Sequence, residues 1–416
     1  MITPTNWACA IAHIDADAFY ASCEAARHPE LRARPICVLS NQNAMVVAKS
    51  YSAKNAGVTT GMPVWEARRL VPDAAFLTPD FRFYGQMSAR MFSIMHRYSP
   101  EIEVYSIDEG FMDMNGIRTL WRKSFRQLAD EIRRVIRQEV GITVSIGIST
   151  TRTLAKMASE SNKPDGSTVV PGKRVERFLT DIPVQAIPGI GRNRAALLHK
   201  FNILTAHDFI RAGKALIHRL LGRHGLVLFE ELNGRSVMKL ETEQSLPKSM
   251  SRTASMGEVS GNARLIRAHL FCHVMRLVSD LVAKRLLTRH LQIFLTLKSF
   301  EKQATAVELD FPSNSLKVLN RAVSRAFQQL YRADGLYRGC GIVADRISEE
   351  GSATEDLFGF MREDLRQSRL MHVVNDINSR YGRGMVSLAA SHGPGPNGKG
   401  RDKAVRFQYP VITAEF

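Results

Sequence analysis

The chain has 416 residues, 44% of them hydrophobic, and a formal net charge of +17, so we expect roughly two to four folded domains and a polyanionic partner. No apolar run reaches the roughly 18 residues of a membrane-spanning helix, and the first residues lack a signal-peptide pattern. The five cysteines form no C-x-x-C pair, which favours free thiols in a cytoplasmic protein over zinc ligands or disulfides.

The first 175 residues alternate predicted strands and helices. The predicted strands are short and apolar, and they are Ala8–Ile14, Pro35–Leu39, Met45–Ala48 and Val144–Ile148. The predicted helices are Phe19–Arg27, Ser50–Ala56, Pro63–Leu70, Tyr84–Tyr98, Phe125–Glu139 and Arg152–Glu160. Between the helices, Ile102–Met114 is predicted to form a hairpin.

Two acidic segments lie on predicted strands of this region. Asp108 and Glu109 sit between short apolar runs, and a tight connection there would aim both carboxylates at one site. Asp15 and Asp17 are two residues apart and are predicted to share a strand face. Converging carboxylates suit Mg²⁺, and two such ions about 3.5–4 Å apart are the usual device for phosphoryl transfer. The alternative for Asp108 and Glu109 is an exposed hairpin turn.

The next region differs in pattern. Ile187–Gly191 followed by the helical Arg194–Lys200 is typical of a helix-hairpin-helix, in which Gly189 and Gly191 let backbone amides approach a DNA phosphate. An ordinary Pro-Gly turn between helices is the alternative. The polar stretch Glu241–Lys248 is predicted to be a linker.

Beyond the linker, the predicted order is strand, helix, strand, strand, helix, strand, which favours a small α+β domain. These elements are Arg252–Val259, Ala263–Leu287, Leu291–Ser299, Thr305–Phe311, Leu316–Tyr331 and Gly339–Arg346. Lys248–Ser348 carries 16 Lys and Arg against 7 Asp and Glu, a net of +9, which favours a phosphate-contacting surface. Periodicity weakens after Glu349, so we expect a flexible tail there, with Gly393–Gly400 as a loop.

Four motifs resemble, in order and spacing, those of Y-family translesion DNA polymerases. They are His13–Glu24, Tyr105–Phe111, Leu154–Ala158 and Pro188–Gly191, and the resemblance covers about residues 8–348. Within the family the chain is most similar to the UmuC type, the catalytic subunit of DNA polymerase V. The stretches that carry this similarity are Phe19–Glu24, Val104–Glu109 and Asn375–Gly384. The DinB type, DNA polymerase IV, is the near alternative.

The resemblance implies an α+β multidomain protein with a right-hand architecture. The expected domains are a palm (1–26 and 80–174), fingers (27–79), a helix-hairpin-helix thumb (175–240), a linker (241–247), a βαββαβ little finger (248–348) and a C-terminal tail (349–416).

The resemblance also implies roles for individual residues. Asp15 and Asp108, with the backbone carbonyl of Ala16, would bind two Mg²⁺ ions, and Glu109 would help to hold the ion that assists the primer 3′-hydroxyl. Tyr20 matches the steric gate, a ring that occupies the space of a ribose 2′-hydroxyl; its alternative is a core aromatic.

The other positions that match substrate-contacting residues are Phe19, Tyr51, Lys54 and Lys163. Lys54 stands where many family members have Arg, so its contact would be a point charge and not a bidentate fork. For Lys163 the alternative is a solvated loop lysine.

The resemblance implies primed template DNA and deoxynucleoside triphosphates as substrates, in DNA damage tolerance and SOS mutagenesis. Leu357 and Phe358 resemble the motif by which bacterial polymerases dock on the sliding clamp, although Thr354 replaces the usual Gln. A UmuD′-like subunit and RecA are further partners of the UmuC type.

Two other functional classes stay open. One is a palm-fold nucleotide cyclase, which has no use for a helix-hairpin-helix. The other is an inactive DNA-bound scaffold, which would be expected to lack the metal-binding acids.

Overall fold

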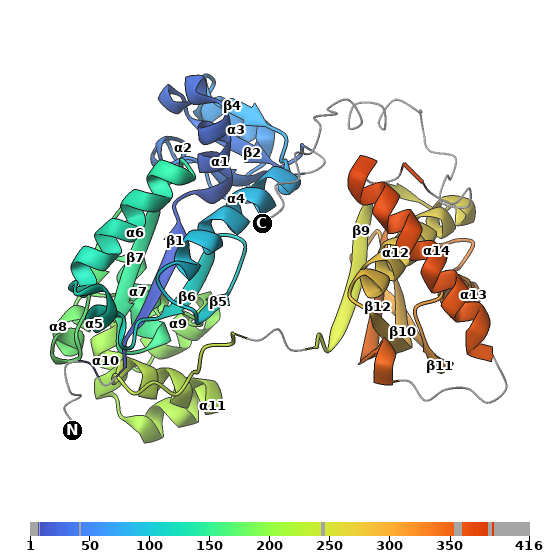
Figure 1. Cartoon of the computed structure of the whole chain (residues 1–416). Helices are drawn as coiled ribbons and strands as arrows, with labels where there is room; N and C mark the ends of the chain where they lie inside the picture. Colours follow the sequence, from blue (N-terminus) through green and yellow to red (C-terminus); the bar gives the residue numbers. More distant parts are fainter. Residues whose placement is uncertain are drawn as a thin grey trace. The chain divides into compact units, whose positions relative to one another are not determined.

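The computed structural model describes residues 7, 9–40, 43–242, 246–352, 360–381 and 385–386. The chain divides into two compact units, Met1–Gln244 and Ser245–Phe416 (Figure 1). The boundary falls inside the polar stretch expected to be a linker. Among the described residues, no helix has the length and apolar character needed to cross a membrane.

A five-stranded sheet forms the centre of the first unit, in the order β5-β6-β1-β7-β8. Its strands are β1 (Ile11–Ala16), β5 (Ile102–Val104), β6 (Glu109–Asp113), β7 (Val144–Ser149) and β8 (Ser167–Val169). The central strand β1 pairs antiparallel with both β6 and β7. Both edges of β1 are therefore paired, and Ala12 and Ile14 are fully buried.

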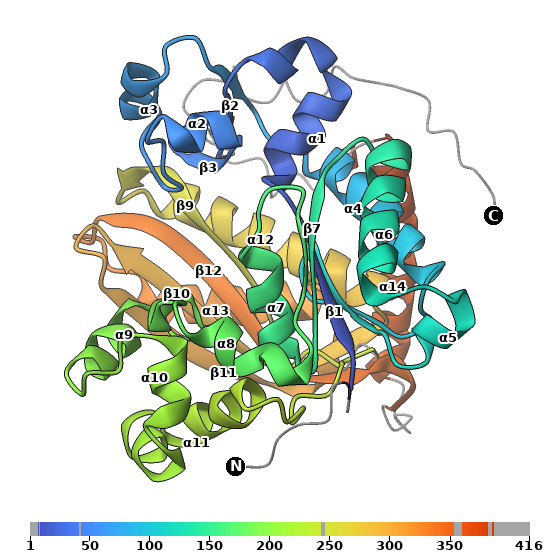
Figure 2. The same ribbon diagram turned by 90° about the vertical axis from the view of Figure 1, so that its left-hand side faces the viewer.

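Helices cover the two faces of this sheet unequally. The helices are α1 (Phe19–Arg27), α4 (Phe81–His96), α5 (Ile117–Trp121), α6 (Phe125–Glu139) and α7 (Arg152–Glu160). Figure 2 shows α4 and α6 on one side of β1 and β7, and α7 on the other. Because Gly147 of β7 lacks a side chain, α7 lies directly on the sheet: a Cβ at Gly147 would come within 2.1 Å of the Ala155 carbonyl oxygen.

The predicted bounds of α1, α6 and α7 match the structure, and local capping explains two of them. Ser124 and Gln127 form a capping box at the start of α6, and the Thr151 side chain caps the start of α7. Such caps satisfy backbone amides that have no partner within the helix, so they fix where a helix begins.

Two smaller parts complete the first unit. A three-stranded sheet, in the order β3-β2-β4, is built from β2 (Ile36–Leu39), β3 (Val46–Lys49) and β4 (Ala75–Leu77), with α2 (Tyr51–Asn55) and α3 (Val64–Leu70). A helical part contains α8 (Val175–Leu179), α9 (Arg192–His199), α10 (Ala206–Arg211) and α11 (Lys214–Leu232). Its apolar core includes Leu154, Met157 and Ala158 of α7.

The second unit is a four-stranded antiparallel sheet in the order β11-β10-β12-β9. Its strands are β9 (Ser249–Ser260), β10 (Leu286–Leu297), β11 (Lys302–Ser313) and β12 (Tyr337–Glu349), and its helices are α12 (Ala263–Ala283) and α13 (Leu316–Leu330). The chain order confirms the predicted βαββαβ pattern.

Helix α14 (Phe360–Tyr381) corrects the expectation of a flexible tail after Glu349. Met371 is only 5% exposed and belongs to the core of the second unit. The Asn375 side chain donates a hydrogen bond to the carbonyl of Ser279 in α12 at 3.0 Å. Since α14 packs through a narrow face, its sequence lacks the broad apolar stripe by which a helix is usually predicted.

His273 of α12 is a buried titratable group in the core region of the second unit. It is 3% exposed, and in the described part of the chain neither ring nitrogen has a hydrogen-bond partner. Burial, reinforced by the charges of Arg276, His269 and Arg252, lowers its pKa from 6.5 to about 4.

We expect His273 to make stability depend on pH. Between pH 6.5 and 4 the unfolded chain binds a proton that the folded chain does not, so stability falls as pH falls through this window. At pH 5 the loss is about 2 kcal/mol. Denaturant unfolding of the full chain at pH 7.5 and 5.0 measures it. His273→Leu should reduce this slope, whereas the control His218→Leu, at an exposed position, should keep it; equal slopes in both variants would refute the assignment.

Candidate active site

The two acidic segments meet because β1 and β6 are neighbours in the central sheet. Asp15 of β1 pairs with Glu109 of β6. The amide of Ala16 donates to the carbonyl of Asp108 at 2.9 Å. The sheet register therefore brings together residues that lie far apart in the sequence, as expected.

Three side chains form a compact group at this point. His13, Asp15 and Glu109 offer potential ligand atoms that all lie within 4.8 Å of one another. His13 Nε2 lies 3.0 Å from Glu109 Oε2, and His13 Nδ1 lies 2.7 Å from the hydroxyl of Ser159. Both imidazole nitrogens thus have partners, and the carboxylates are the groups left to bind a ligand.

Two lysines compensate the carboxylates. Lys156 of α7 forms an ion pair with Glu109. Lys163 places its Nζ 2.7 Å from Asp15 Oδ1 and 2.7 Å from Glu160 Oε1. Each of the two carboxylates thus has a lysine partner, as in a site that binds a charged substrate.

The pKa shifts show how far this compensation goes. Burial opposes ionisation of Glu109, but the hydrogen bonds from His13 and Lys156 outweigh it and lower the pKa to about 2. Burial dominates at Asp15 and raises its pKa to about 7 despite Lys163. Burial also disfavours the charge of Lys163, yet Asp15 and Glu160 outweigh it and raise the pKa. The attraction of Lys163 therefore does not fully offset the cost of burying the charge of Asp15.

The donor set fits a hard divalent cation. The carboxylates of Asp15 and Glu109 and the carbonyl of Ala16 are oxygen ligands, which Mg²⁺ prefers. A bound cation would also supply the positive charge that Asp15 lacks, and would reverse the direction of its pKa shift.

Asp108 is not a member of the compact His13–Asp15–Glu109 group. Its carboxylate accepts a hydrogen bond from the hydroxyl of Ser106 at 2.5 Å. After burial, the charge of Asp108 is the second cause that raises the pKa of Tyr20. Asp108 therefore faces the Tyr20 side of the site.

Asp17 lies on the same face as Asp15, as expected, because its carboxylate bonds Ser145, the residue that pairs with Asp15 across β1 and β7. Strand β1 ends at Ala16, and Ala18 turns the chain with a positive φ of 47°. The carboxylate of Asp17 is 1% exposed and accepts hydrogen bonds from the Ser145 hydroxyl at 2.7 Å and the Asp165 amide at 2.8 Å.

Tyr20 is held by other aromatic rings. Its ring stacks on that of Tyr84, with centroids 4.5 Å apart and an interplanar angle of 17°, and it contacts Phe81 edge-on at 5.7 Å. Phe19 is 3% exposed and belongs to the core of the central sheet. The side chain of Phe19 is thus packed away, so only its backbone could meet a substrate.

Tyr51 and Lys54 lie on α2, beside the small sheet. Lys54 Nζ lies 5.6 Å from the centroid of the Tyr51 ring. Burial, followed by the charge of Asp17, raises the pKa of Tyr51 to about 12. This places Tyr51 on the side of the acids, whereas Lys54 is exposed.

Comparison with known proteins places this site in a family. Residues 14–160 match the impB/mucB/samB family, and residues 247–357 match its C-terminal domain. The chain is 30% identical over 387 residues to DNA polymerase IV of Bacillus velezensis, which covers 91% of this chain and 92% of that protein. It is 35% identical to DNA polymerase IV of Alkalilimnicola ehrlichii over 260 residues, or 61% of this chain and 71% of that protein.

The chain belongs to the Y family of DNA polymerases. As a member it is an enzyme of the DNA-directed DNA polymerase class. A solved chimera of the Y-family polymerases Dbh and Dpo4 has the same fold, with a TM-score of 0.70 at 21% identity over 81% of this chain and 99% of that chain. The expected fold class, a multidomain right-hand polymerase, is therefore confirmed.

Gly189 and Gly191 of this Y-family polymerase are both exposed. Gly189 has a φ of +89°, and a Cβ there would come within 2.8 Å of His224 Nε2, so a larger residue would be strained and would have to displace the His224 side chain. Gly191 begins α9 without a side-chain cap, which leaves the first amides of the helix available for a phosphate.

The predicted clamp-docking residues Leu357 and Phe358 lie outside the described residues, and so does Thr354.

Sequence reasoning missed the parts that His13, Lys156 and Ser159 play around Glu109. A usable signal existed for His13, because it lies two residues before Asp15 on the same strand and so shares its face. Lys156 and Ser159 are three apart on α7 and share a helix face. Only the packing of α7 over the sheet brings that face to Glu109, and no sequence pattern predicts this.

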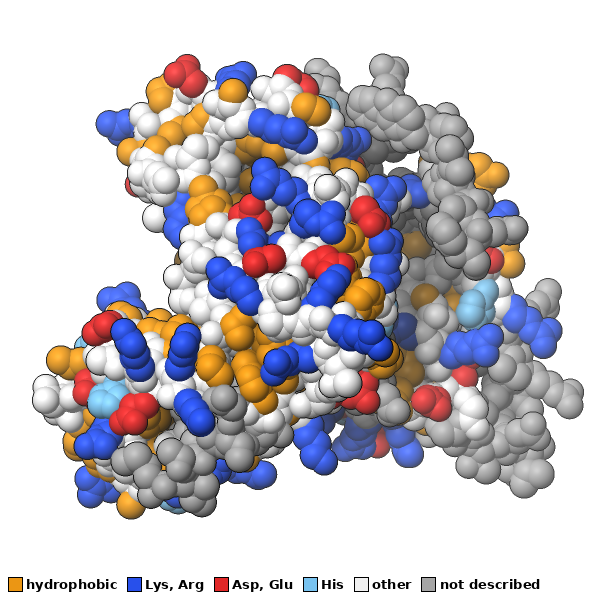
Figure 3. Space-filling model, turned by 60° about the vertical axis from the view of Figure 1, so that its left-hand side comes forward, with side chains coloured by type: hydrophobic (Ala, Val, Ile, Leu, Met, Phe, Trp, Pro, Cys, Tyr) orange, Lys and Arg blue, Asp and Glu red, His pale blue; other side chains and the backbone are white. Residues whose placement is uncertain are grey.

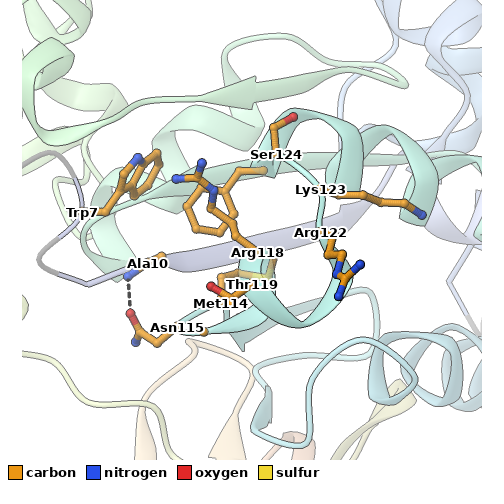
Figure 4. A pocket seen from close by; sticks show the side chains of 11 residues that line it. Trp7, Ala10, Met114, Asn115, Arg118, Thr119, Arg122, Lys123 and Ser124 are labelled. Carbon is orange, nitrogen blue, oxygen red and sulfur yellow. Dashed lines mark hydrogen bonds between the residues drawn. The ribbon is translucent and has the colours of Figure 1, made fainter.

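A separate pocket of about 620 Å³ lies near Ala10, at the other end of β1 from the carboxylates. Figure 4 shows Arg118 beside Trp7, and the Ala10 amide bonded to the Asn115 side chain. Arg118 also lies over the ring of Phe125, at 5.2 Å.

Basic side chains do not gather at one place on the face drawn in Figure 3. Lys and Arg side chains are spread widely there and interspersed with acidic ones, so surface charge alone does not mark the candidate active site.

Proposed function

We propose that this Y-family member is a DinB-type translesion polymerase that adds deoxynucleotides to a primer 3′ end in the order a template dictates. The observation that carries the proposal is the register of β1 against β6, which sets Asp15 opposite Glu109 beside Lys156 and Lys163. Neither an exposed hairpin turn nor a catalytically inactive scaffold requires partly buried carboxylates that are each paired with a lysine.

In this proposal the chain's residues bind and orient. Asp15, Asp108 and the Ala16 carbonyl would hold two Mg²⁺ ions, with Glu109 at the one nearer the primer terminus. When bound, these ions would lower the pKa of the 3′-hydroxyl and neutralise charge on the leaving pyrophosphate. His13 and Lys156 keep Glu109 ionised, so it is ready to accept a cation.

Further residues would bind the incoming nucleotide. Lys163, Tyr51 and Lys54 would contact the triphosphate, and the ring of Tyr20 would exclude a 2′-hydroxyl. Support comes from Lys163, whose ammonium already lies beside Asp15, and from the packing that fixes Tyr20.

The DinB type is preferred to the UmuC type because the relatives reported above are named DNA polymerase IV. The UmuC similarity of Asn375–Gly384 remains a prediction, and so does a role in SOS mutagenesis. Partners beyond DNA and deoxynucleotides also remain predictions: a sliding clamp at Leu357 and Phe358, a UmuD′-like subunit and RecA.

For the domains, we infer a palm (1–26 and 80–174), fingers (27–79), a thumb (175–240) and a linker (241–247). We extend the proposed little finger from 248–348 to Tyr381, because α14 packs on α12 through Met371 and Asn375.

Primer extension by the purified chain tests the proposal. The substrates are an undamaged primed template and one with an abasic site, with all four deoxynucleotides and with or without Mg²⁺. We expect template-directed, Mg²⁺-dependent extension on the first and insertion opposite the lesion on the second. DNA binding without extension would support the scaffold, and template-independent formation of a cyclic nucleotide would support the cyclase.

A further inference from the structure

Asp17 is a buried carboxylate that the proposed mechanism does not use. It is 1% exposed, and its two oxygens have separate partners on separate elements. Oδ1 accepts from the hydroxyl of Ser145 in β7, and Oδ2 accepts from the backbone amide of Asp165. Asp17 therefore ties the end of β1 to a strand on one side and to a loop on the other.

That loop, residues 162–166, carries Lys163. Its turn is tight, because a Cβ on Gly166 would come within 1.7 Å of the Asn162 carbonyl oxygen. Helix α6 holds the outer side of the loop: Arg133 and Arg137 lie 2.9 and 3.0 Å from the two carboxylate oxygens of Asp165. Asp17 therefore anchors the loop from the end of β1, which we call the inner anchor, and the two arginines anchor it from α6, which we call the outer anchor.

We propose that Asp17 is a positioning residue: it fixes loop 162–166 so that Lys163 faces the incoming triphosphate. This inference rests on the proposed role of Lys163. Asp17 follows Ala16 directly and lies two residues beyond Asp15, so its hydrogen bond to Asp165 sets the distance between the end of the acidic strand and the lysine loop. Lys163 has a long, flexible side chain, and an anchored backbone reduces the entropy lost when its ammonium binds a phosphate.

The geometry distinguishes this role from direct metal binding. An Asn at position 17 can accept from the Asp165 amide with its oxygen and donate to the Ser145 hydroxyl with its nitrogen. Asp17→Asn therefore keeps both hydrogen bonds and removes the charge. Asp17→Ala removes both hydrogen bonds and leaves the Asp165 amide without its partner.

The experiment measures kcat and KM for single-nucleotide addition with the full chain, for a matching deoxynucleotide. The variants are Asp17→Asn, Asp17→Ala, Lys163→Ala and the double variant D17A/K163A. We expect Lys163→Ala and Asp17→Ala each to raise KM about tenfold or more, as the loss of a charge-assisted contact does. Asp17→Asn should stay within about twofold of the parent. The double variant should resemble Lys163→Ala alone, because two changes that act through one contact do not add.

Each contrary result has a distinct meaning. If Asp17→Asn were as damaging as Asp17→Ala, the charge of Asp17 would act directly and the positioning role would be overturned. Multiplied effects in the double variant would also overturn it, because independent destabilisation adds. A parental KM for Lys163→Ala would refute the role of Lys163 and this inference with it, whereas a raised KM for Lys163→Ala with a parental KM for Asp17→Ala would refute this inference alone.

A second variant covers the case in which Asp17→Ala does not fold. Arg137 is exposed and reaches the loop through its ion pair with Asp165, so Arg137→Ala removes part of the outer anchor with little risk to folding. We expect a rise of about two- to threefold in KM that disappears in the Lys163→Ala background. A rise that persists in that background would overturn the positioning role of the loop anchors.

Discussion

Asp108→Asn is expected to abolish nucleotide addition while DNA binding stays near the parental level. The amide oxygen of Asn can still accept the hydrogen bond from Ser106, and the backbone bond from Ala16 to the carbonyl of residue 108 is untouched. Only the negative charge is lost. If Asp108 holds a Mg²⁺ ion, the transition state loses several kcal/mol of stabilisation, or about a thousandfold or more in rate.

Single-turnover primer extension in saturating Mg²⁺ measures this loss, and a fluorescence-anisotropy titration measures DNA binding. The matched control is Asp113→Asn at the other end of β6, where the acid pairs with Ile11 of β1 and accepts from the Asn115 amide. That variant should extend the primer at close to the parental rate. An Asp108→Asn enzyme as fast as this control would show that Asp108 binds no essential ion.

Tyr20→Ala is expected to admit ribonucleotides. The ring of Tyr20 is held between its contacts with Tyr84 and Phe81, so it cannot swing aside for an added hydroxyl. Deleting the ring opens that space and leaves Asp15 and Glu109 unchanged. We expect selectivity for deoxynucleotides to fall by about a hundredfold, the scale of discrimination that a close-packed wall provides.

The measurement is kcat/KM for a ribonucleotide and a deoxynucleotide of the same base, each in Mg²⁺. Tyr20→Phe is the control, because it keeps the ring and removes only the hydroxyl; it should retain parental selectivity. If Tyr20→Ala kept its selectivity and lost thermal stability instead, Tyr20 would be a packing residue and the alternative interpretation would hold.

Much of the site could be predicted from the sequence because it depends on strands. The convergence of Asp15 and Glu109 follows from two short apolar runs with acids at their ends, and the structure pairs them directly. The expectation that Asp15 and Asp17 share a face is also confirmed, because Asp17 bonds the hydroxyl of Ser145, the residue opposite Asp15 on β7.

The features that the sequence analysis missed depend on tertiary packing. The contact of Lys156 with Glu109 requires α7 to lie against Gly147, and nothing in either segment predicts that approach. Helix α14 was missed because the contacts of Met371 and Asn375 depend on the packing of α14 against α12. Local sequence patterns therefore predict which side chains can bind a ligand or take part in chemistry. Tertiary packing determines which of these side chains come into contact.

Helix α7 contributes residues to two apolar clusters, and this determines how local unfolding affects the enzyme. Ala155 packs with Ile11 and Phe111 on the sheet, while Leu154 and Met157 belong to the core of the helical part. A fluctuation that unfolds the helical part would therefore remove the packing of Leu154 and Met157 and loosen the contact of Lys156 with Glu109. The amides of α7 should exchange with solvent hydrogen at the rate of the helical part, not that of the sheet, so local unfolding of the helical part would disassemble the catalytic centre without any strand coming apart.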